Sequence, residues 1–244
     1  MKNPGPNPVE LLRSLALDTP MSRQPFSVIP EMLWPALYAD NFEGQYNWKP
    51  MPTYCTGSDY VQETATRAAL VGTQALTLKT KATTPTALDC VAVYRHACMG
   101  PSNFIRYQGA LNFPTEGDSG YFSFWMFFLD GALRYKSGMR FWTNGRADYH
   151  GDDTYDHQVP ALKVVTTPNS WNKFDFMVDV HAHKYVYVAL NAVRVALTQP
   201  ILQYGDWDDT SLALDLVLWT NQDARIEAYI DQLLVTPHPA APIL

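Results

Sequence analysis

Residues 172–180 read NKFDFMVDV, a stretch in which apolar and polar side chains alternate. Phe174, Phe176 and Val178 fall on one face of an extended chain, while Lys173 and Asp175 fall on the other. This two-residue period predicts a strand that buries one face and leaves the other in water. The rest of the chain is best understood outward from this strand.

Similar short runs lie on both sides of it. Residues 185–188 and 193–197 enclose Asn191 and Ala192, which are predicted to form a tight hairpin turn because Asn tolerates the left-handed conformation. Other runs rich in Val, Phe, Tyr, Trp and Thr recur roughly every ten residues between Gly, Asn, Asp and Pro clusters. The predicted strands are 37–42, 64–70, 75–80, 87–94, 104–111, 120–129, 139–143, 162–166, 172–180, 184–190, 193–198, 211–220 and 224–235. No long segment has helical periodicity, so the predicted fold class is all-β, a two-sheet antiparallel β-sandwich.

The N-terminal segment has a different texture. Residues 1–35 carry prolines at positions 4, 6, 8, 20, 25, 30 and 35, a density that neither a packed strand nor a long helix tolerates. We expect this Pro-rich arm to lie over the domain or over a neighbouring subunit, which makes a homo-oligomer formed through the arm a candidate assembly. Residues 36–244 contain no linker-like stretch and are predicted to form one domain.

Composition narrows the class of partner. The 244 residues are 13% aromatic and 17% charged, with a formal net charge of -6, which argues against binding to nucleic acids or anionic membranes. Neutral, hydroxyl-rich ligands fit this balance better. Cys55, Cys90 and Cys98 have no metal-ligand spacing and are predicted to be buried thiols. The early apolar run is interrupted by Arg13, and no stretch approaches the roughly 20 apolar residues of a membrane span, so we expect a cytoplasmic protein unless the chain is a processed form.

Three motifs suggest a family. They are DNFEG at residues 40–44, WNKFDF at 171–176 with the hairpin around Asn191, and YIDQLLV at 229–235. Together they resemble the concanavalin-A-like lectin and glucanase superfamily, a jelly-roll fold, and the two ends are similar to carbohydrate-binding modules. Folds of this kind host binding modules, hydrolases and lyases alike.

The resemblance also implies a metal site. In carbohydrate-binding modules the first and last strands lie side by side and often hold a structural calcium ion through an acidic residue from each end. The matching positions are Glu43 and Asp231, with Asp40 as a further candidate. Calcium takes six to eight oxygen ligands, so backbone carbonyls would have to complete the set. The alternative is that these acids cap exposed strand ends.

Aromatic residues supply the candidate ligand site. Strand alternation separates a Trp from the aliphatic face in the strands at 120–129, 139–143 and 211–220. If these strands are neighbours on a concave sheet face, they offer planar surfaces on which a sugar ring can stack. The predicted ligand-binding residues are Tyr107, Trp125, Arg140, Trp142, Trp219 and Asn221. The alternative is that these tryptophans pack under loops or under the N-terminal arm.

The segment 148–157 supplies the candidate catalytic groups. It gathers two histidines and four aspartates and is interpreted as a loop, from which His150, Asp152 and Asp153 are the acid/base candidates. Its spacing matches no established zinc or EF-hand pattern, and a solvated loop is the alternative. His181 and His183 would share one face of an extended chain, but we expect them to lie in a turn. The closely spaced acids of retaining glucanases are absent.

The leading functional hypothesis is therefore a non-catalytic protein that binds a saccharide or glycoside on the concave-face tryptophans. The first alternative is a carbohydrate-active enzyme, either a polysaccharide lyase or a glycoside hydrolase. The second alternative is a structural or assembly subunit that uses the arm and the exposed aromatic residues as contacts.

Overall fold

The computed structural model describes residues 36–43, 48–51, 61–65, 69–80, 90–98, 102–114, 120–131, 133–151, 156–167, 170–206, 211–220 and 225–238. These residues form two antiparallel sheets of eight strands each. In sheet A the order is β13 (Val193–Ala196), β12 (Lys184–Leu190), β11 (Trp171–Asp179), β6 (Phe104–Asn112), β16 (Glu227–His238), β4 (Ala75–Lys79) and β3 (Val61–Ala65), with β1 (Tyr38–Asp40) paired to β16. In sheet B it is β10 (Asp156–Lys163), β9 (Arg146–His150), β8 (Leu133–Trp142), β7 (Gly120–Asp130), β15 (Ser211–Thr220), β5 (Cys90–Cys98) and β2 (Lys49–Pro50), with β14 (Leu202–Asp206) paired to β8.

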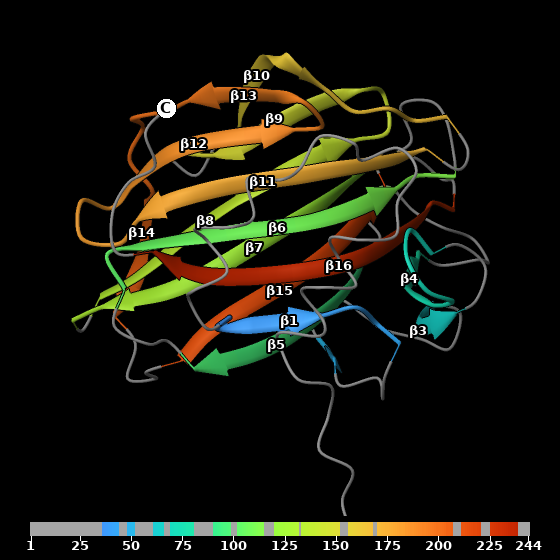
Figure 1. Cartoon of the computed structure of the whole chain (residues 1–244), viewed down its shortest axis with the longest axis horizontal. Helices are drawn as coiled ribbons and strands as arrows, with labels where there is room; N and C mark the ends of the chain where they lie inside the picture. The colour runs from blue at the N-terminus through green and yellow to red at the C-terminus, as the bar shows by residue number, and fades with distance from the viewer. Residues whose placement is uncertain are drawn as a thin grey trace, which may run out of the picture.

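The two sheets lie face to face. Figure 1 shows β12, β11, β6 and β16 of sheet A crossing in front of β8, β7 and β15 of sheet B. The first and last of the described strands in chain order, β1 and β16, are paired, with Tyr38 opposite Val235 and Asp40 opposite Leu233. The predicted all-β sandwich is confirmed.

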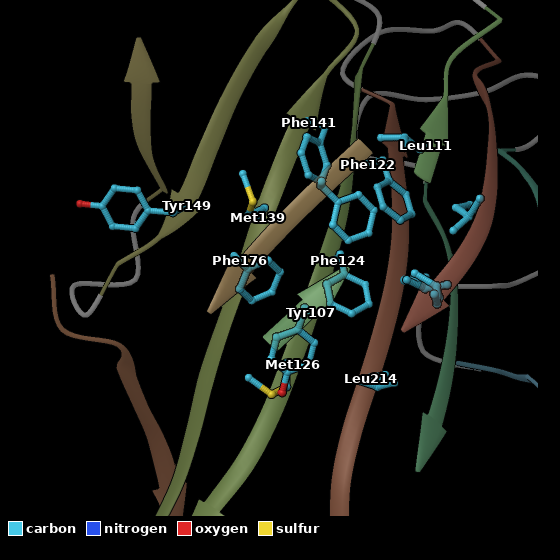
Figure 2. Packing of buried hydrophobic residues seen from close by; sticks show 14 of the residues in the cluster. Tyr107, Leu111, Phe122, Phe124, Met126, Met139, Phe141, Tyr149, Phe176 and Leu214 are labelled. Atoms are coloured by element: carbon cyan, nitrogen blue, oxygen red, sulfur yellow. The ribbon is translucent and has the colours of Figure 1, made fainter. Parts of the chain in front are cut away.

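The alternating residues of the two sheets form one core. Phe124 from β7 meets Phe174 and Phe176 from β11, with ring centroids 5.5 Å and 5.9 Å apart. Figure 2 shows Phe124 beside Phe176 in this core. Burial of each such ring contributes on the order of 2 to 3 kcal/mol. The alternation in residues 172–180 thus determines which face of β11 packs against sheet B.

The predicted strand boundaries agree best with the observed ones where the alternation in the sequence is clear. β12 and β15 coincide with the predicted strands at 184–190 and 211–220. β8 begins at Leu133, six residues before the predicted start. The sequence pattern missed this first half because it carries Arg134, Lys136 and Gly138, residue types that are uncommon in strands. The strands β2, β9 and β14 were not predicted. The Asn191 turn is confirmed, since Asn191 has a φ of 55° and joins β12 to β13.

A register shift in β12 has a consequence for the site. Tyr187 lies opposite Met177 and Tyr185 lies opposite Val178, so the bulge between them places the two tyrosines on opposite faces of sheet A. Tyr185 joins the core, whereas Tyr187 lies on the outer face, where its hydroxyl donates to Asp175 at 2.8 Å.

Several sequence predictions fall outside the described residues. These are the arm at 1–35, Cys55, Asp152, Asp153 and Asn221. Cys90 is a buried thiol, as predicted. Within the described ranges, no helix has the length and hydrophobicity needed to span a membrane.

Candidate functional site

The predicted tryptophans share the outer face of sheet B. β8, β7 and β15 are direct neighbours, which is the arrangement that the aromatic-platform hypothesis requires. Tyr121 of β7 lies opposite Trp142 of β8 and opposite Trp219 of β15, with ring centroids 4.6 Å and 6.1 Å apart. A row of three aromatic rings therefore crosses three strands. Tyr121 was not among the predicted site residues, although it shares the strand parity of Trp125.

Tyr107 does not belong to this face. It lies on β6 of sheet A, where its ring stacks on Phe176 at 4.8 Å between centroids, and it is 0% exposed (Figure 2). Burial raises its pKa well above the ordinary value. The expectation that Tyr107 lines the ligand face is wrong, because the parity of β6 turns this side chain toward sheet B and the core.

The interpretation of residues 148–157 as a loop is also wrong at both ends of the segment. β9 and β10 form an antiparallel pair in which Asp156 lies opposite His150 and Gln158 opposite Asp148. On β8, Arg140 lies opposite Asp148. Strand pairing thus brings Asp148, His150, Asp156 and Arg140 onto one face, while the intervening Tyr149 packs in the core.

An ion-paired carboxylate orients His150. Asp156 Oδ2 lies 2.5 Å from the Nη1 atom of Arg140, and its Oδ1 lies 3.2 Å from Nδ1 of His150. In a neutral imidazole the nitrogen beside a carboxylate carries the hydrogen, so Nε2 keeps its lone pair. Nε2 is buried and has no hydrogen-bond partner among the described residues. The His150 side chain is 7% exposed, and its ring centroid lies 6.5 Å from that of Trp125.

A lysine lies over Trp125. The Nζ atom of Lys136 is 3.6 Å from the centre of the Trp125 ring, within the range of a cation–π interaction. Burial lowers the pKa of Lys136 to about 8, opposed by the nearby charges of Asp156 and Asp215. Burial raises the pKa of Asp215 to about 7, opposed by Arg134 and Lys136. Ionised and neutral forms of both side chains are therefore accessible near neutral pH.

Asp148 has a different role from Asp156. Its Oδ2 accepts from Nε1 of Trp142 at 2.7 Å, and its Oδ1 accepts from Nε of Arg146 at 2.6 Å. Both oxygens are engaged and the residue is fully buried, so Asp148 fixes the orientation of Trp142 and Arg146.

Tyr185 supports the site from below. Its hydroxyl accepts from the backbone N–H of Gly138 at 2.8 Å and lies within hydrogen-bond reach of the carbonyls of Gly138 at 3.1 Å and His150 at 2.9 Å. The β8–β9 ladder ends at the preceding pair, Met139 and Tyr149, so this hydroxyl replaces the next rung. A Cβ at position 138 would lie 2.2 Å from the carbonyl oxygen of Phe124, which explains the glycine.

Glu43 and Asp231 both bind the backbone of the segment 70–74. Glu43 accepts hydrogen bonds from the backbone N–H groups of Thr73 and Gln74, each at 2.6 Å. Asp231 Oδ2 accepts from Leu70 at 2.9 Å and Val71 at 3.1 Å. Burial, with a smaller contribution from the charge of Glu43, raises the pKa of Asp231 to about 7 against the opposing effect of backbone hydrogen bonds to its carboxylate. The two carboxylates are thus close enough to repel each other.

The donor chemistry of this pair suits calcium in part. Glu43 and Asp231 supply carboxylate oxygens, a ligand type that calcium prefers, but the backbone groups that meet them in residues 70–74 are N–H donors. Asp40 instead accepts hydrogen bonds from Tyr38, Trp48 and the Phe42 backbone. Across the part of the chain that the structure describes, no three or more His, Cys, Asp or Glu side chains form a group suited to a metal ion.

His181 and His183 lie in the β11–β12 turn, as expected. Both face Asp130 at the end of β7, with ring nitrogens 3.7 Å and 2.8 Å from its Oδ2. The His183 ring also stacks on Tyr135, with the centroids 3.8 Å apart. This contact joins the two sheets at one end of the sandwich.

Two antiparallel sheets with a shared aromatic core and paired terminal strands define a concanavalin-A-like jelly roll, and this chain has that fold. No protein-family model matches the chain, and no curated protein matches it significantly. It is similar to the solved structure of an endo-β-1,4-glucuronan lyase from the fungus Trichoderma reesei, with a TM-score of 0.56 and 10% identity over 84% of this chain and 96% of that one. The β-glucanase of Bacillus licheniformis has a TM-score of 0.52 and 13% identity over 82% of this chain and 98% of that one. A carbohydrate esterase from a Shiga toxin-encoding bacteriophage has a TM-score of 0.53 and 13% identity over 84% of this chain and 99% of that one. Identities this low establish the shared fold alone.

Proposed function

We propose that the protein is a carbohydrate-active enzyme that binds a saccharide on the outer face of sheet B, with His150 as the group that removes a proton from the substrate or from a water molecule. The observation that carries the proposal is the Asp156–His150 pair. A carboxylate holds Nδ1, and the opposite nitrogen has no partner among the described residues. An imidazole oriented in this way is the general-base arrangement found in many enzymes.

The surroundings of His150 support a bound sugar. Trp125 lies beside the imidazole, and the Trp142, Tyr121 and Trp219 row continues the aromatic surface across the sheet. Aromatic rings next to hydrogen-bonding side chains suit a pyranose, which has apolar C–H faces and polar edges. The similar structures include proteins named as a lyase, a glucanase and an esterase of carbohydrates, which agrees with this ligand class.

The geometry favours catalysis over passive binding. A binding platform needs ring faces that are open to the sugar, whereas Lys136 lies over Trp125 and Arg140 lies 4.1 Å from the centre of the Tyr121 ring. A glycosidase needs a pair of carboxyl groups on either side of the bond that is cleaved. Here Asp148 and Asp156 are both held by arginines. We therefore place a histidine-based mechanism, such as that of a lyase, ahead of a two-carboxylate hydrolase.

His150→Asn tests the proposal. The amide of Asn can keep the hydrogen bond to Asp156, but it has no basic nitrogen that could accept a proton. We expect cleavage of the substrate found in a panel of acidic and neutral polysaccharides to fall by roughly a hundredfold or more, with little change in thermal stability. His157→Asn is the matched control, because it removes an imidazole from the neighbouring strand position opposite Tyr149. Unchanged cleavage in His150→Asn would refute the assignment, and saccharide binding without any cleavage would leave a binding protein.

We also propose that Glu43 and Asp231 bind calcium in a structural role. The support is their placement around residues 70–74 and the electrostatic cost of two nearby carboxylates, which a divalent cation would offset.

A further inference from the structure

We infer that the saccharide bound by this face is anionic, and that the acidic group of one sugar residue is held by Arg140 and Ser123 with Lys136 nearby. This inference rests on the proposed function and adds the chemical class of the substrate to it. It reverses the expectation of a neutral ligand that the net charge of the whole chain suggested.

The first argument is that cations lie over the aromatic rings of this face. Arg134 lies 4.2 Å from the centre of the Phe127 ring, Lys136 lies 3.6 Å from that of Trp125, and Arg146 lies 5.4 Å from that of Trp142. A sugar that stacks on the face of a ring covered by one of these side chains would meet positive charge there. Stacking of a neutral sugar would have to displace these side chains.

The second argument is local charge. The described side chains around these rings include three arginines, Arg134, Arg140 and Arg146, and also Lys136, whose pKa burial lowers to about 8. The described carboxylates next to them include Asp148, Asp156 and Asp215, and burial leaves Asp215 only partly ionised near neutral pH. Among these described side chains the cations outnumber the ionised carboxylates near neutral pH, although the whole chain has a formal net charge of -6.

The third argument is a pair of buried donors on adjacent strands. Ser123 on β7 lies directly opposite Arg140 on β8, so their Cβ atoms are neighbours. The hydroxyl of Ser123 and the Nε–H of Arg140 are both buried and have no hydrogen-bond partner among the described residues. A buried donor without an acceptor costs about 1 to 3 kcal/mol. A carboxylate accepts from both donors and also offsets the charge of the guanidinium.

The position of these donors agrees with the proposed chemistry. Arg140 is also bound to Asp156, the carboxylate that orients His150. An acidic group held by Arg140 and Ser123 would therefore lie two residues along β8 and β7 from the Gly138–Trp125 pair, on the same sheet face as the proposed base. The site would then recognise a uronate residue of an acidic polysaccharide.

Calorimetric titration with a matched ligand pair tests the inference. One ligand is an oligoglucuronate, and the other is the same oligosaccharide after its carboxyl groups have been reduced to hydroxymethyl groups. Both are titrated into the His150→Asn variant, in which turnover is suppressed. We expect the acidic ligand to bind at least tenfold more tightly than the reduced ligand, with an affinity that falls as the salt concentration rises.

Variants locate the effect. Ser123→Ala is expected to weaken binding of the acidic ligand by roughly three- to tenfold, and Lys136→Gln by about tenfold, with no change for the reduced ligand. The matched control is Ser137→Ala, which removes another buried hydroxyl from the same sheet at a position that faces the core. Equal or tighter binding of the reduced ligand would overturn the inference and leave the proposed function intact. No binding of either ligand would overturn the inference, and no cleavage across the polysaccharide panel would overturn the proposed function separately.

Discussion

Tyr185→Phe is a direct test of how the core supports the site. The substitution removes one hydroxyl group and keeps the ring, which packs at 5.3 Å from the Tyr149 centroid. The lost hydroxyl accepts from the Gly138 N–H and reaches the carbonyls of Gly138 and His150, where the β8–β9 ladder has ended. The backbone of both strands would then face the core without that partner.

The expected cost follows from these contacts. One hydroxyl donates a single hydrogen, so it satisfies one carbonyl and one N–H at a time. Leaving two buried polar groups without this partner costs about 1 to 3 kcal/mol each, and we expect a loss of about 3 kcal/mol in the free energy of unfolding. For a domain of this size the melting temperature should fall by roughly 6 to 12 °C.

Tyr187→Phe is the control. It removes the same group from the same strand, but on the outer face, where Asp175 keeps two hydrogen bonds from Arg106 at 3.0 Å and 2.7 Å. We expect a loss of about 1 kcal/mol there. Denaturant titration of the two variants and the wild type measures both values. If Tyr185→Phe is no less stable than Tyr187→Phe, the hydroxyl does not replace a missing rung and the reasoning is wrong.

Two further predictions concern carboxyl groups. Calcium at about 100 times its dissociation constant should stabilise the wild type by about 2.7 kcal/mol, and chelation should reverse the effect. The double variant Glu43→Gln, Asp231→Asn should show neither response, and an equal calcium-dependent rise in melting temperature in both proteins would exclude this site. Separately, the folded state holds the proton of Asp215 more tightly than the unfolded state, because its pKa is raised from 3.8 to about 7. Its contribution to the free energy of unfolding should therefore fall as the pH rises from about 4 to about 7 and stay constant above that. Asp215→Asn should make this decline shallower in denaturant titrations across that range, and an unchanged slope would show that Asp215 does not titrate there.

The candidate site was only partly predictable. The parity of Trp125, Trp142 and Trp219 relative to their aliphatic neighbours followed from alternation within each strand, and the structure places all three on the outer face of sheet B. The same logic missed the position of Tyr107, because parity within β6 does not say which face of that strand is buried until its partners in sheet A and sheet B are known. Asp148, His150 and Asp156 were assigned to a loop because charged residues are uncommon in strands.

The sequence alone determined the fold class, since the two-residue period in 172–180 and its counterparts admits only strands with one buried face, and enough such strands must pair and bury those faces together. Only the tertiary structure decided which residues meet. The β9–β10 pairing that joins His150 to Asp156, the β7–β8 register that places Ser123 opposite Arg140, and the bulge that sends Tyr185 through the core are relations between segments distant in the chain or shifts of a single residue. Alternation within a strand carries no information on register between strands, and a shift of one residue moves every side chain to the other face.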